Sequence, residues 1–230
     1  MQQYGRFFTT IRAIARLGVR KKRLSDPDGL LQPAIYIGRH LDSFGPVQTM
    51  IHFPIPVRIW AIYTLADPQS ATEHYREYTY HKRYGWPMFL ARPVAWVAGH
   101  MVGNLLQSSG AIPVYRGHRE VMRTMDHTVE CLAAGDNILL FPDIDYTSES
   151  GTAGPIYTGF VHLAKMAYER NNGQLVPFIP IYVSKHHPVL EIGKPIYYNP
   201  EVSFRAERTR IAEEITNQLT ELAARVGEKE

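Results

Sequence analysis

Short β-prone runs alternate with helical patterns along most of the chain, and this alternation constrains the fold more than any single motif does. Expected strands lie at residues 33–38, 57–65, 112–115, 137–141, 176–183 and 189–192. Helical patterns occupy 69–82, 119–134 and 156–170 between them, and a further amphipathic pattern follows the last strand at 203–226. Because strands that alternate with helices usually form a parallel sheet covered by helices, the sequence predicts an α/β fold with a mixed, mostly parallel sheet.

The first 23 residues differ from the rest in charge. They hold seven basic side chains and no acidic one, which leaves 18 basic against 22 acidic residues elsewhere. Apolar residues recur there at helical spacing, while Arg12, Arg16 and Arg20 follow at four-residue steps on another face. Such a helix either lies on an anionic membrane surface or docks on the protein with its basic face in water. We expect residues 1–24 to form a membrane-surface helix and residues 30–230 to form one α/β domain.

Charge and composition exclude several classes of protein. A basic arm on a slightly acidic body favours local docking over nucleic-acid binding. Cys131 is the only cysteine, so neither an internal disulfide nor a cysteine metal site can form, which fits a reducing environment. No apolar run reaches the roughly 18 residues that span a bilayer, and nucleotide-binding and protease signatures are absent. We therefore expect a cytoplasmic protein, peripheral on the inner face of the membrane, with no nucleic-acid partner.

One apolar stretch, residues 86–107, holds two tryptophans and two prolines. It fits a hydrophobic surface or lid, and it equally fits a helix packed on the sheet, because the sequence does not separate an exposed patch from core.

Four short motifs follow one another near the ends or starts of the expected strands. They are GRHLDSFGP at 38–46, GAIPVYR at 110–116, FPDID at 141–145 and VPFIPI at 176–181. In this order they resemble the blocks of the glycerol-phosphate and lysophosphatidic acid acyltransferases, which read Asn-His-four residues-Asp, then Gly to Arg, then Phe-Pro-Glu-Gly-Thr-Arg, then Val-Pro. The resemblance covers about residues 30–195. It places His40 on the family's catalytic histidine, Arg116 on the second-block arginine, and Phe141 and Pro142 on the start of the third block.

The resemblance implies acyl transfer to a lipid-like hydroxyl or amine at a membrane lipid surface. The donor would be an acyl-CoA or acyl-carrier-protein thioester, used as a co-substrate with no further cofactor. His40 would act as the general base, because an imidazole with a pKa near about 6.5 can take a proton at neutral pH. A carboxylate on its other nitrogen would hold the tautomer.

The family's aspartate, five residues after the histidine, is Gly45 in this chain. Asp42 could replace it if the loop turns differently, and Asp143 or Asp145 could approach from a neighbouring strand end. A water molecule or a main-chain carbonyl is a further candidate for orienting the imidazole. The catalytic group predicted from the sequence is therefore His40 with Asp42, Asp143 and Asp145.

The third block also departs from the family, because Asp143, Ile144, Asp145 and Tyr146 follow Phe-Pro where the family has Glu-Gly-Thr-Arg. Arg39 and Arg116 would then meet a phosphate against nearby negative charge. We expect Arg39, Arg116, Phe141, Pro142 and Tyr146 to bind an acceptor that is a neutral polyol, a zwitterion or an amine.

Two other readings follow from these departures. His40 and the Asp-x-Asp pair at 143–145 carry the ligand atoms that divalent ions accept, but the pattern is weakly specific and a structural role is preferred, so we expect no metal. A catalytically silent relative that binds lipid or an acyl carrier is the alternative function, since a fold does not guarantee an activity.

Overall fold

The computed structural model describes residues 3–26, 29–115, 117, 120–148, 150 and 152–228. Contacts divide the chain into two compact units. The sheet unit comprises Ile14–Val57 and Met125–Glu230, and the hairpin unit comprises Gln2–Ala13 and Arg58–Thr124. The predicted boundary between the basic segment 1–24 and the domain 30–230 stays a prediction, because the two units are defined by contacts between residues and not by charge.

The sheet unit is built on a mostly parallel sheet. Its strands, in spatial order, are β1 (Arg23–Leu24), β7 (Val189–Ile192), β6 (Phe178–Val183), β2 (Ile35–Ile37) and β5 (Ile138–Leu140). The pairs β1–β7, β6–β2 and β2–β5 are parallel, and β6–β7 is antiparallel. Every residue of β2, β5 and β6 is buried, as expected for strands covered on both faces. This confirms the predicted α/β class.

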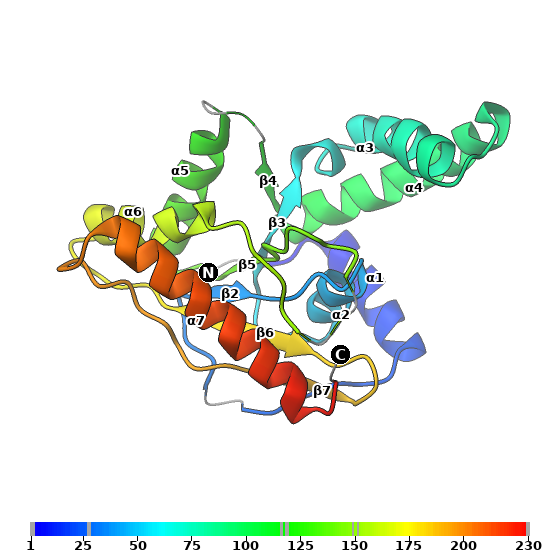
Figure 1. Ribbon diagram of the computed structural model, residues 1–230. Helices are drawn as coiled ribbons and strands as arrows, with labels where there is room; N and C mark the ends of the chain where they lie inside the picture. The colour runs from blue at the N-terminus through cyan, green and yellow to red at the C-terminus, as the bar shows by residue number, and fades with distance from the viewer. Residues whose placement is uncertain are drawn as a thin grey trace. The chain divides into compact units, whose positions relative to one another are not determined.

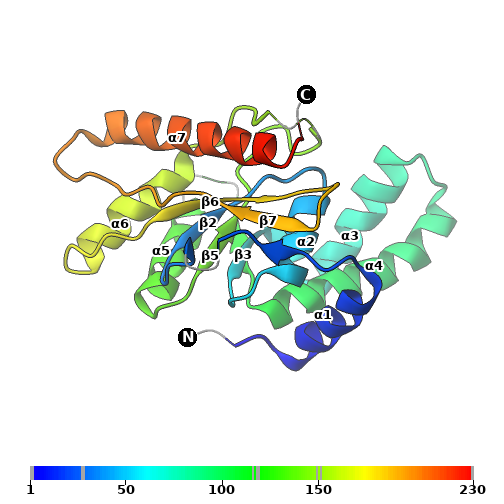
Figure 2. The same cartoon turned by 90° about the horizontal axis from the view of Figure 1, so that it is seen from below.

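Helices cover this sheet (Figures 1 and 2). They include α2 (Phe44–His52), the short 3₁₀ turn η4 (Gly159–Val161), α6 (His162–Arg170) and α7 (Phe204–Arg225), while α5 (Glu120–Ala133) contributes its later residues. The α7 helix begins at Ser203, whose side chain accepts a hydrogen bond from the main-chain nitrogen of Ala206. Its apolar row, Ile211, Ile215, Leu219 and Leu222, is buried against the core. The predicted terminal helix at 203–226 is therefore present.

The hairpin unit holds two parallel strands, β3 (Arg58–Ile62) and β4 (Ile112–Val114), and a pair of helical arms. After the short turn η2 (Tyr63–Leu65), α3 (Pro68–His74) continues as a π-helical segment, η3 (Tyr75–Arg83), and α4 (Met88–Ser109) returns beside them (Figure 1). Asp67 starts α3 by accepting hydrogen bonds from the main chain of Gln69 and Ser70, with Pro68 at the first helical position. Pro87 begins α4, whereas Pro93 lies inside it.

The first helix, α1 (Arg6–Gly18), is shorter than the expected helix at residues 1–24. The chain leaves the helix after Gly18 and forms β1 at Arg23–Leu24. In the hairpin unit, Phe8 is buried and its main-chain nitrogen donates to the Ser108 hydroxyl. Leu17, in contrast, is 89% exposed. Within the described part of the chain, no helix combines the length and the apolar character needed to cross a bilayer.

Candidate functional site

Two neighbouring parallel strands bring the predicted catalytic residues together. Strands β2 and β5 pair in register, with Ile37 opposite Leu140, so the residues that follow each strand meet at one edge of the sheet. His40 follows β2, and Asp143 follows β5. The Asp143 carboxylate accepts a hydrogen bond from the main-chain nitrogen of His40 at 2.8 Å. The third motif therefore holds the histidine loop by its backbone and not by its imidazole.

Asp143 also forms a buried ion pair with Arg39. The Arg39 Nε atom lies 2.7 Å from the Asp143 carboxylate, and the two side chains are 2% and 6% exposed. The Nη1 atom of Arg39 donates to the main-chain oxygens of Ser150 and Thr152, at 3.3 and 3.0 Å. A buried charge that lost its partner would be strongly unfavourable, so this pair fixes the segment after β5 onto the histidine loop.

The His40 imidazole is oriented by a main-chain carbonyl. Its Nδ1 atom is hydrogen-bonded to the main-chain oxygen of Asp42. Because a carbonyl can only accept, Nδ1 carries the proton in the neutral ring, and Nε2 keeps a lone pair that can take a proton from another molecule. The rings of Phe141 and Tyr146 lie edge-on to the imidazole, with centroid distances of 5.9 and 5.7 Å.

A sharp bend after His40 makes this bond possible. Leu41 and Asp42 both have positive φ angles, 47° and 59°, a region that costs non-glycine residues about 1–3 kcal/mol each. Leu41 is held there because its side chain is buried in a cluster with Tyr182 and Leu222. The bend turns the Asp42 carbonyl back toward the ring, while the Asp42 carboxylate lies 3.4 Å from the Ser43 hydroxyl.

Gly45, at the family's aspartate position, packs directly on the backbone of the loop. A Cβ atom built on Gly45 would lie 1.9 Å from the main-chain oxygen of Arg39 and 2.9 Å from that of His40. The main-chain nitrogen of Gly45 donates to the His40 oxygen at 3.0 Å. No side chain fits at this position while the loop keeps this shape. The loop shape that excludes a side chain at position 45 is thus the same shape that orients the imidazole through the Asp42 carbonyl.

The other residues of the third motif hold the loop that follows β5. The Asp145 carboxylate accepts hydrogen bonds from the hydroxyl and the main-chain nitrogen of Thr147, and these bonds lower the pKa of Asp145. The main-chain oxygen of Tyr146 accepts from the Asp42 nitrogen at 2.8 Å, and that of Pro142 accepts from Tyr157. Tyr146 therefore contributes both its ring and its backbone to the His40 loop.

A polar hollow of about 300 Å³ lies beside this arrangement. It is lined by Arg39, Asp143, Asp145, Ser148, Ser150, Thr152, Ala153, Gly154 and Pro155. Since the Arg39 charge is already matched by Asp143, the hollow presents carboxylate, hydroxyl and main-chain oxygens to a ligand. Such a lining suits a molecule that donates hydrogen bonds.

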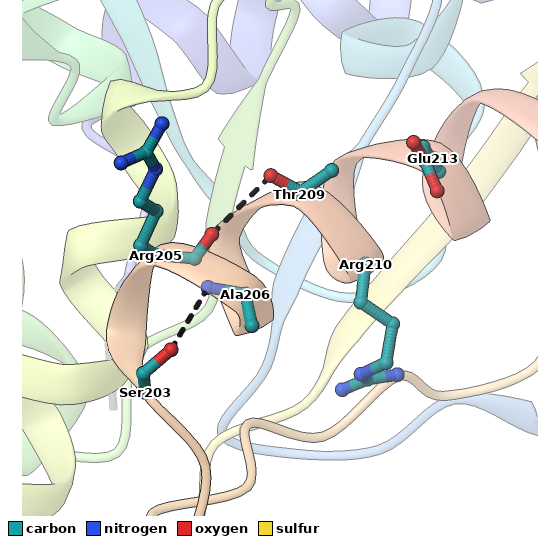
Figure 3. A pocket seen from close by; sticks show the side chains of 6 residues that line it. All are labelled: Ser203, Arg205, Ala206, Thr209, Arg210 and Glu213. Carbon is teal, nitrogen blue, oxygen red and sulfur yellow. Dashed lines mark hydrogen bonds between the residues drawn. The ribbon is translucent and has the colours of Figure 1, made fainter.

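A larger hollow of about 510 Å³ lies along the start of α7 (Figure 3). The dashed contacts there are local: the Ser203 cap on Ala206, and the Thr209 hydroxyl bonded to the Arg205 carbonyl. Arg210 is paired with Glu207 and Glu214 on the same helix. None of the site residues predicted from the sequence lines this hollow, and its bonds are those that build a helix.

Two sequence predictions need separate mention. Arg116, predicted to position the acceptor, lies outside the described residues. Among the residues that the structure describes, no group of three or more His, Cys, Asp or Glu side chains is arranged to hold a metal ion.

Sequence reasoning left a main-chain carbonyl open as the orienting group without naming that of Asp42, and it missed the roles of Leu41 and of the backbone approach at Gly45. Gly45 was the available signal, since a glycine in place of a functional side chain often marks a close approach of backbone.

Comparisons with known proteins concern the family and the fold. The family model described as Acyltransferase matches residues 77–184, a range that holds the second, third and fourth motifs and leaves His40 outside. The crystal structure of the 1-acyl-sn-glycerophosphate (LPA) acyltransferase PlsC from Thermotoga maritima is similar, with a TM-score of 0.58 and 13% sequence identity. The similarity covers 94% of this chain and 80% of that one, and at this identity it shows a shared fold. No curated protein matches the chain in sequence.

Residues 77–184 therefore match an Acyltransferase family model, and the chain shares its fold with a 1-acyl-sn-glycerophosphate acyltransferase.

Proposed function

We propose that this protein moves a fatty acyl group from an acyl-CoA or acyl-carrier-protein thioester to a lipid-like hydroxyl or amine at a membrane surface. The observation that carries the proposal is the His40 imidazole at the carboxyl end of β2, with Nδ1 bonded to the Asp42 carbonyl and Nε2 left to accept a proton. Active sites in open α/β sheets gather at this edge, beyond the carboxyl ends of the strands.

The proposed reaction uses His40 Nε2 as the general base. The acceptor's O–H or N–H proton moves to Nε2 while the acceptor atom attacks the thioester carbonyl carbon. The resulting tetrahedral intermediate expels the thiolate, which takes a proton from the imidazolium. The Asp42 carbonyl keeps the ring in the productive tautomer during both steps. Because a neutral carbonyl stabilises the imidazolium less than a carboxylate would, we expect slower turnover than a carboxylate-oriented histidine gives.

The polar hollow supports an acceptor other than a simple phosphomonoester. Its carboxylates belong to Asp143 and Asp145, and its arginine, Arg39, is neutralised by an ion pair. A phosphate dianion placed there would face negative charge. A neutral polyol, a zwitterion or an amine would instead donate hydrogen bonds to the lining oxygens. The T. maritima protein is a 1-acyl-sn-glycerophosphate acyltransferase, and we propose that this chain differs in its acceptor.

Two further parts of the proposal come from the sequence. Arg116 positions the acceptor, as the second-block arginine of the family implies. The basic segment 1–24 brings the protein to the inner, cytoplasmic face of a membrane, supported by the exposed Phe7, Ile14 and Leu17 side chains of α1.

A second candidate function is lipid or acyl-carrier binding without catalysis. The observation in its favour is the same loop, because Gly45 leaves the imidazole without the family's carboxylate. The two candidates differ in one respect that can be measured, the release of thiol that depends on an acceptor.

The test is thioester consumption by the purified chain with a panel of acyl-CoA and acyl-carrier-protein donors and mixed lipid acceptors. We expect acceptor-dependent thiol release that is lost in His40→Ala. His127→Ala is the matched control, since His127 has a half-exposed side chain in the same unit and lies outside the site. Release retained in His40→Ala would overturn the mechanism, and no release with any pair, beside measurable lipid binding, would favour the silent protein.

The variant Arg116→Ala tests the proposed role of Arg116 in binding the acceptor. We expect the KM for the acceptor to rise while the KM for the thioester donor stays the same. An unchanged acceptor KM would remove Arg116 from its proposed role.

A further inference from the structure

Helix α4 presents a long apolar face to solvent. Phe89, Trp96, Val97 and Met101 are each more than half exposed, at 73%, 58%, 58% and 52%. At 100° per residue these side chains fall on one side of the helix, together with Leu90, Pro93 and Val94. An exposed apolar surface of this extent usually marks an interaction site.

The opposite side of α4 packs tightly on α3, so the exposed face has a fixed support. The residues buried there are all small, namely Ala91, Ala95, Gly99 and Gly103. A Cβ atom built on Gly99 would lie 2.4 Å from the main chain of Thr72, which shows how closely the two helix backbones approach. The apolar residues cannot turn inward without replacing this contact.

The stretch 78–119, which contains α4, carries charge of one sign, while α3 and η3 beside it hold Glu73 and Glu77. Residues 78–119 contain five lysines and arginines and no aspartate or glutamate. Three of these cations are exposed: Lys82 and Arg83 in the last turn of η3, and Arg92 in the second turn of α4. The segment between η3 and α4 carries Tyr84 and Trp86, both exposed aromatic side chains. Basic residues beside aromatic ones, next to an apolar face, complement the head groups and outer acyl region of an anionic bilayer.

We propose that the exposed face of α4 docks into the interfacial layer of an anionic phospholipid bilayer. Phe89, Val97 and Met101 enter the layer, and Lys82 and Arg83 meet lipid phosphates. The helix lies in the plane of the surface, because no described helix is suited to crossing it. This inference rests on the membrane-surface part of the proposed function and adds a second docking element to the basic first helix.

A second copy of the chain is the main competing occupant. Within 78–119 the face offers no carboxylate to meet the cations of another copy, so self-association through this stretch would bring like charges together. A bilayer that contains anionic lipid supplies the missing countercharge.

The first test is co-sedimentation of the full chain with vesicles of phosphatidylcholine, with and without phosphatidylglycerol. We expect binding that needs phosphatidylglycerol and falls about tenfold or more in Val97→Asp, because an aspartate must be desolvated to enter the interface. Leu175→Asp is the matched control, an exposed leucine of the sheet unit, and it should bind as the native chain does. Leu17→Asp reports separately on α1.

The second test reads the position of one side chain. Trp60→Phe combined with Trp86→Phe leaves Trp96 as the single tryptophan. Its fluorescence should be quenched by lipids brominated near the start of the acyl chain. Trp96 fluorescence that the brominated lipids leave unchanged would overturn the proposal. So would vesicle binding that is native in Val97→Asp and lost only in Leu17→Asp.

Self-association provides the remaining outcome. Sedimentation velocity without vesicles should show no concentration-dependent dimer, and a dimer abolished by Val97→Asp would assign the face to a second copy instead. All these readouts are independent of turnover. If His40→Ala loses acyl transfer and still binds vesicles as the native chain does, the proposed docking of α4 is tested independently of the proposed catalysis by His40.

Discussion

The His40 loop and the α3–α4 hairpin are both built where two stretches of backbone nearly touch, yet they bury opposite kinds of group. At Gly45 a Cβ atom would lie 1.9 Å from a carbonyl oxygen, and at Gly99 it would lie 2.4 Å from the backbone of the facing helix. Around Gly45 the buried groups are charged and hydrogen-bonded, with Arg39 paired to Asp143. Around Gly99 they are alanine and glycine, and the large apolar side chains face outward.

This difference separates two tasks. The loop uses close packing to hold polar atoms at fixed positions, as proton transfer requires. The hairpin uses close packing to hold a surface of exposed apolar side chains. Changes in the loop should therefore alter turnover and stability together, whereas changes on the hairpin surface should alter membrane binding alone.

The largest stability effect should come from Asp143→Asn. The substitution keeps the shape of the side chain but leaves the Arg39 charge buried without its partner, which costs about 3–5 kcal/mol. Urea unfolding followed by circular dichroism measures the free energy. Asp126→Asn is the control, because Asp126 pairs with Arg170 at 2.6 Å with both side chains nearly half exposed, and an exposed pair contributes less than about 1 kcal/mol. Equal losses in the two variants would contradict the buried role of the Arg39–Asp143 pair.

Gly45→Ala should destabilise the protein by about 3 kcal/mol and reduce turnover, because its Cβ would strike a main-chain oxygen that cannot move without opening the loop. Gly18→Ala adds the same methyl group where nothing lies within 4 Å, at the end of α1, and should be neutral or stabilising by up to about 1 kcal/mol. Gly45→Asp, which restores the family's residue, should fail to raise activity for the same steric reason. A stable and faster Gly45→Asp variant would show that the loop adopts the family's usual form.

Gly99→Ala should cost less, about 1–2 kcal/mol, because two helices can shift apart more easily than a tight loop can open. We expect weaker vesicle binding and unchanged transfer to a short-chain, water-soluble acceptor. Met101→Ala on the same helix removes exposed apolar surface without touching the contact with α3, so it should lower vesicle binding at native stability. Loss of transfer to the soluble acceptor in Gly99→Ala would mean that the hairpin also supports catalysis.

Glu228→Gln should have the smallest effect, and its sign depends on pH. Burial raises the pKa of Glu228, but hydrogen bonds from Ser184, Tyr182 and the main chain of His186 outweigh it and lower the pKa. The carboxylate therefore stabilises the fold fully above its unfolded pKa of about 4.3, and this contribution is lost as pH falls through the lower folded value. At neutral pH the variant should lose less than about 1 kcal/mol, since the group is partly exposed.

Thermal unfolding across pH measures this effect. The difference between the native chain and Glu228→Gln should shrink as the solution becomes acidic, while Glu221→Gln, an exposed position on α7, should match the native chain throughout. A difference that grows in acid would reverse the assigned direction of the pKa shift.

Elements with a continuous apolar pattern were predictable from the sequence. The run at 176–183 contains β6, and the 203–226 pattern contains α7, because burial on both faces and a helical apolar row each leave a clear periodicity. The meeting of His40 with Asp143 also follows from sequence order, since both come after neighbouring parallel strands. The apolar stretch 86–107 was predicted to be either surface or core, and α4 is both, with small residues buried and large ones exposed.

The bend at Leu41 and Asp42 could not be predicted. Leucine rarely adopts a positive φ, so no local propensity signals the bend, and only its burial against a distant part of the chain maintains it. For the same reason the orienting group could not be chosen among Asp42, Asp143, Asp145 and a carbonyl: each choice depends on loop geometry that tertiary packing imposes. The two-residue strand β1 was missed because a short edge strand has too few residues to show a period.

The cluster that holds Leu41 also sets a time order on assembly of the site. Leu41 packs on Leu222 and Ala223, which are separated from it by most of the chain, so the bend after His40 has its support only once α7 has docked. Contacts between distant segments form late, since the intervening chain must be ordered first. During synthesis His40 leaves the ribosome well before the residues of α7 do. The nascent chain therefore lacks the support for an oriented imidazole until α7 has been made.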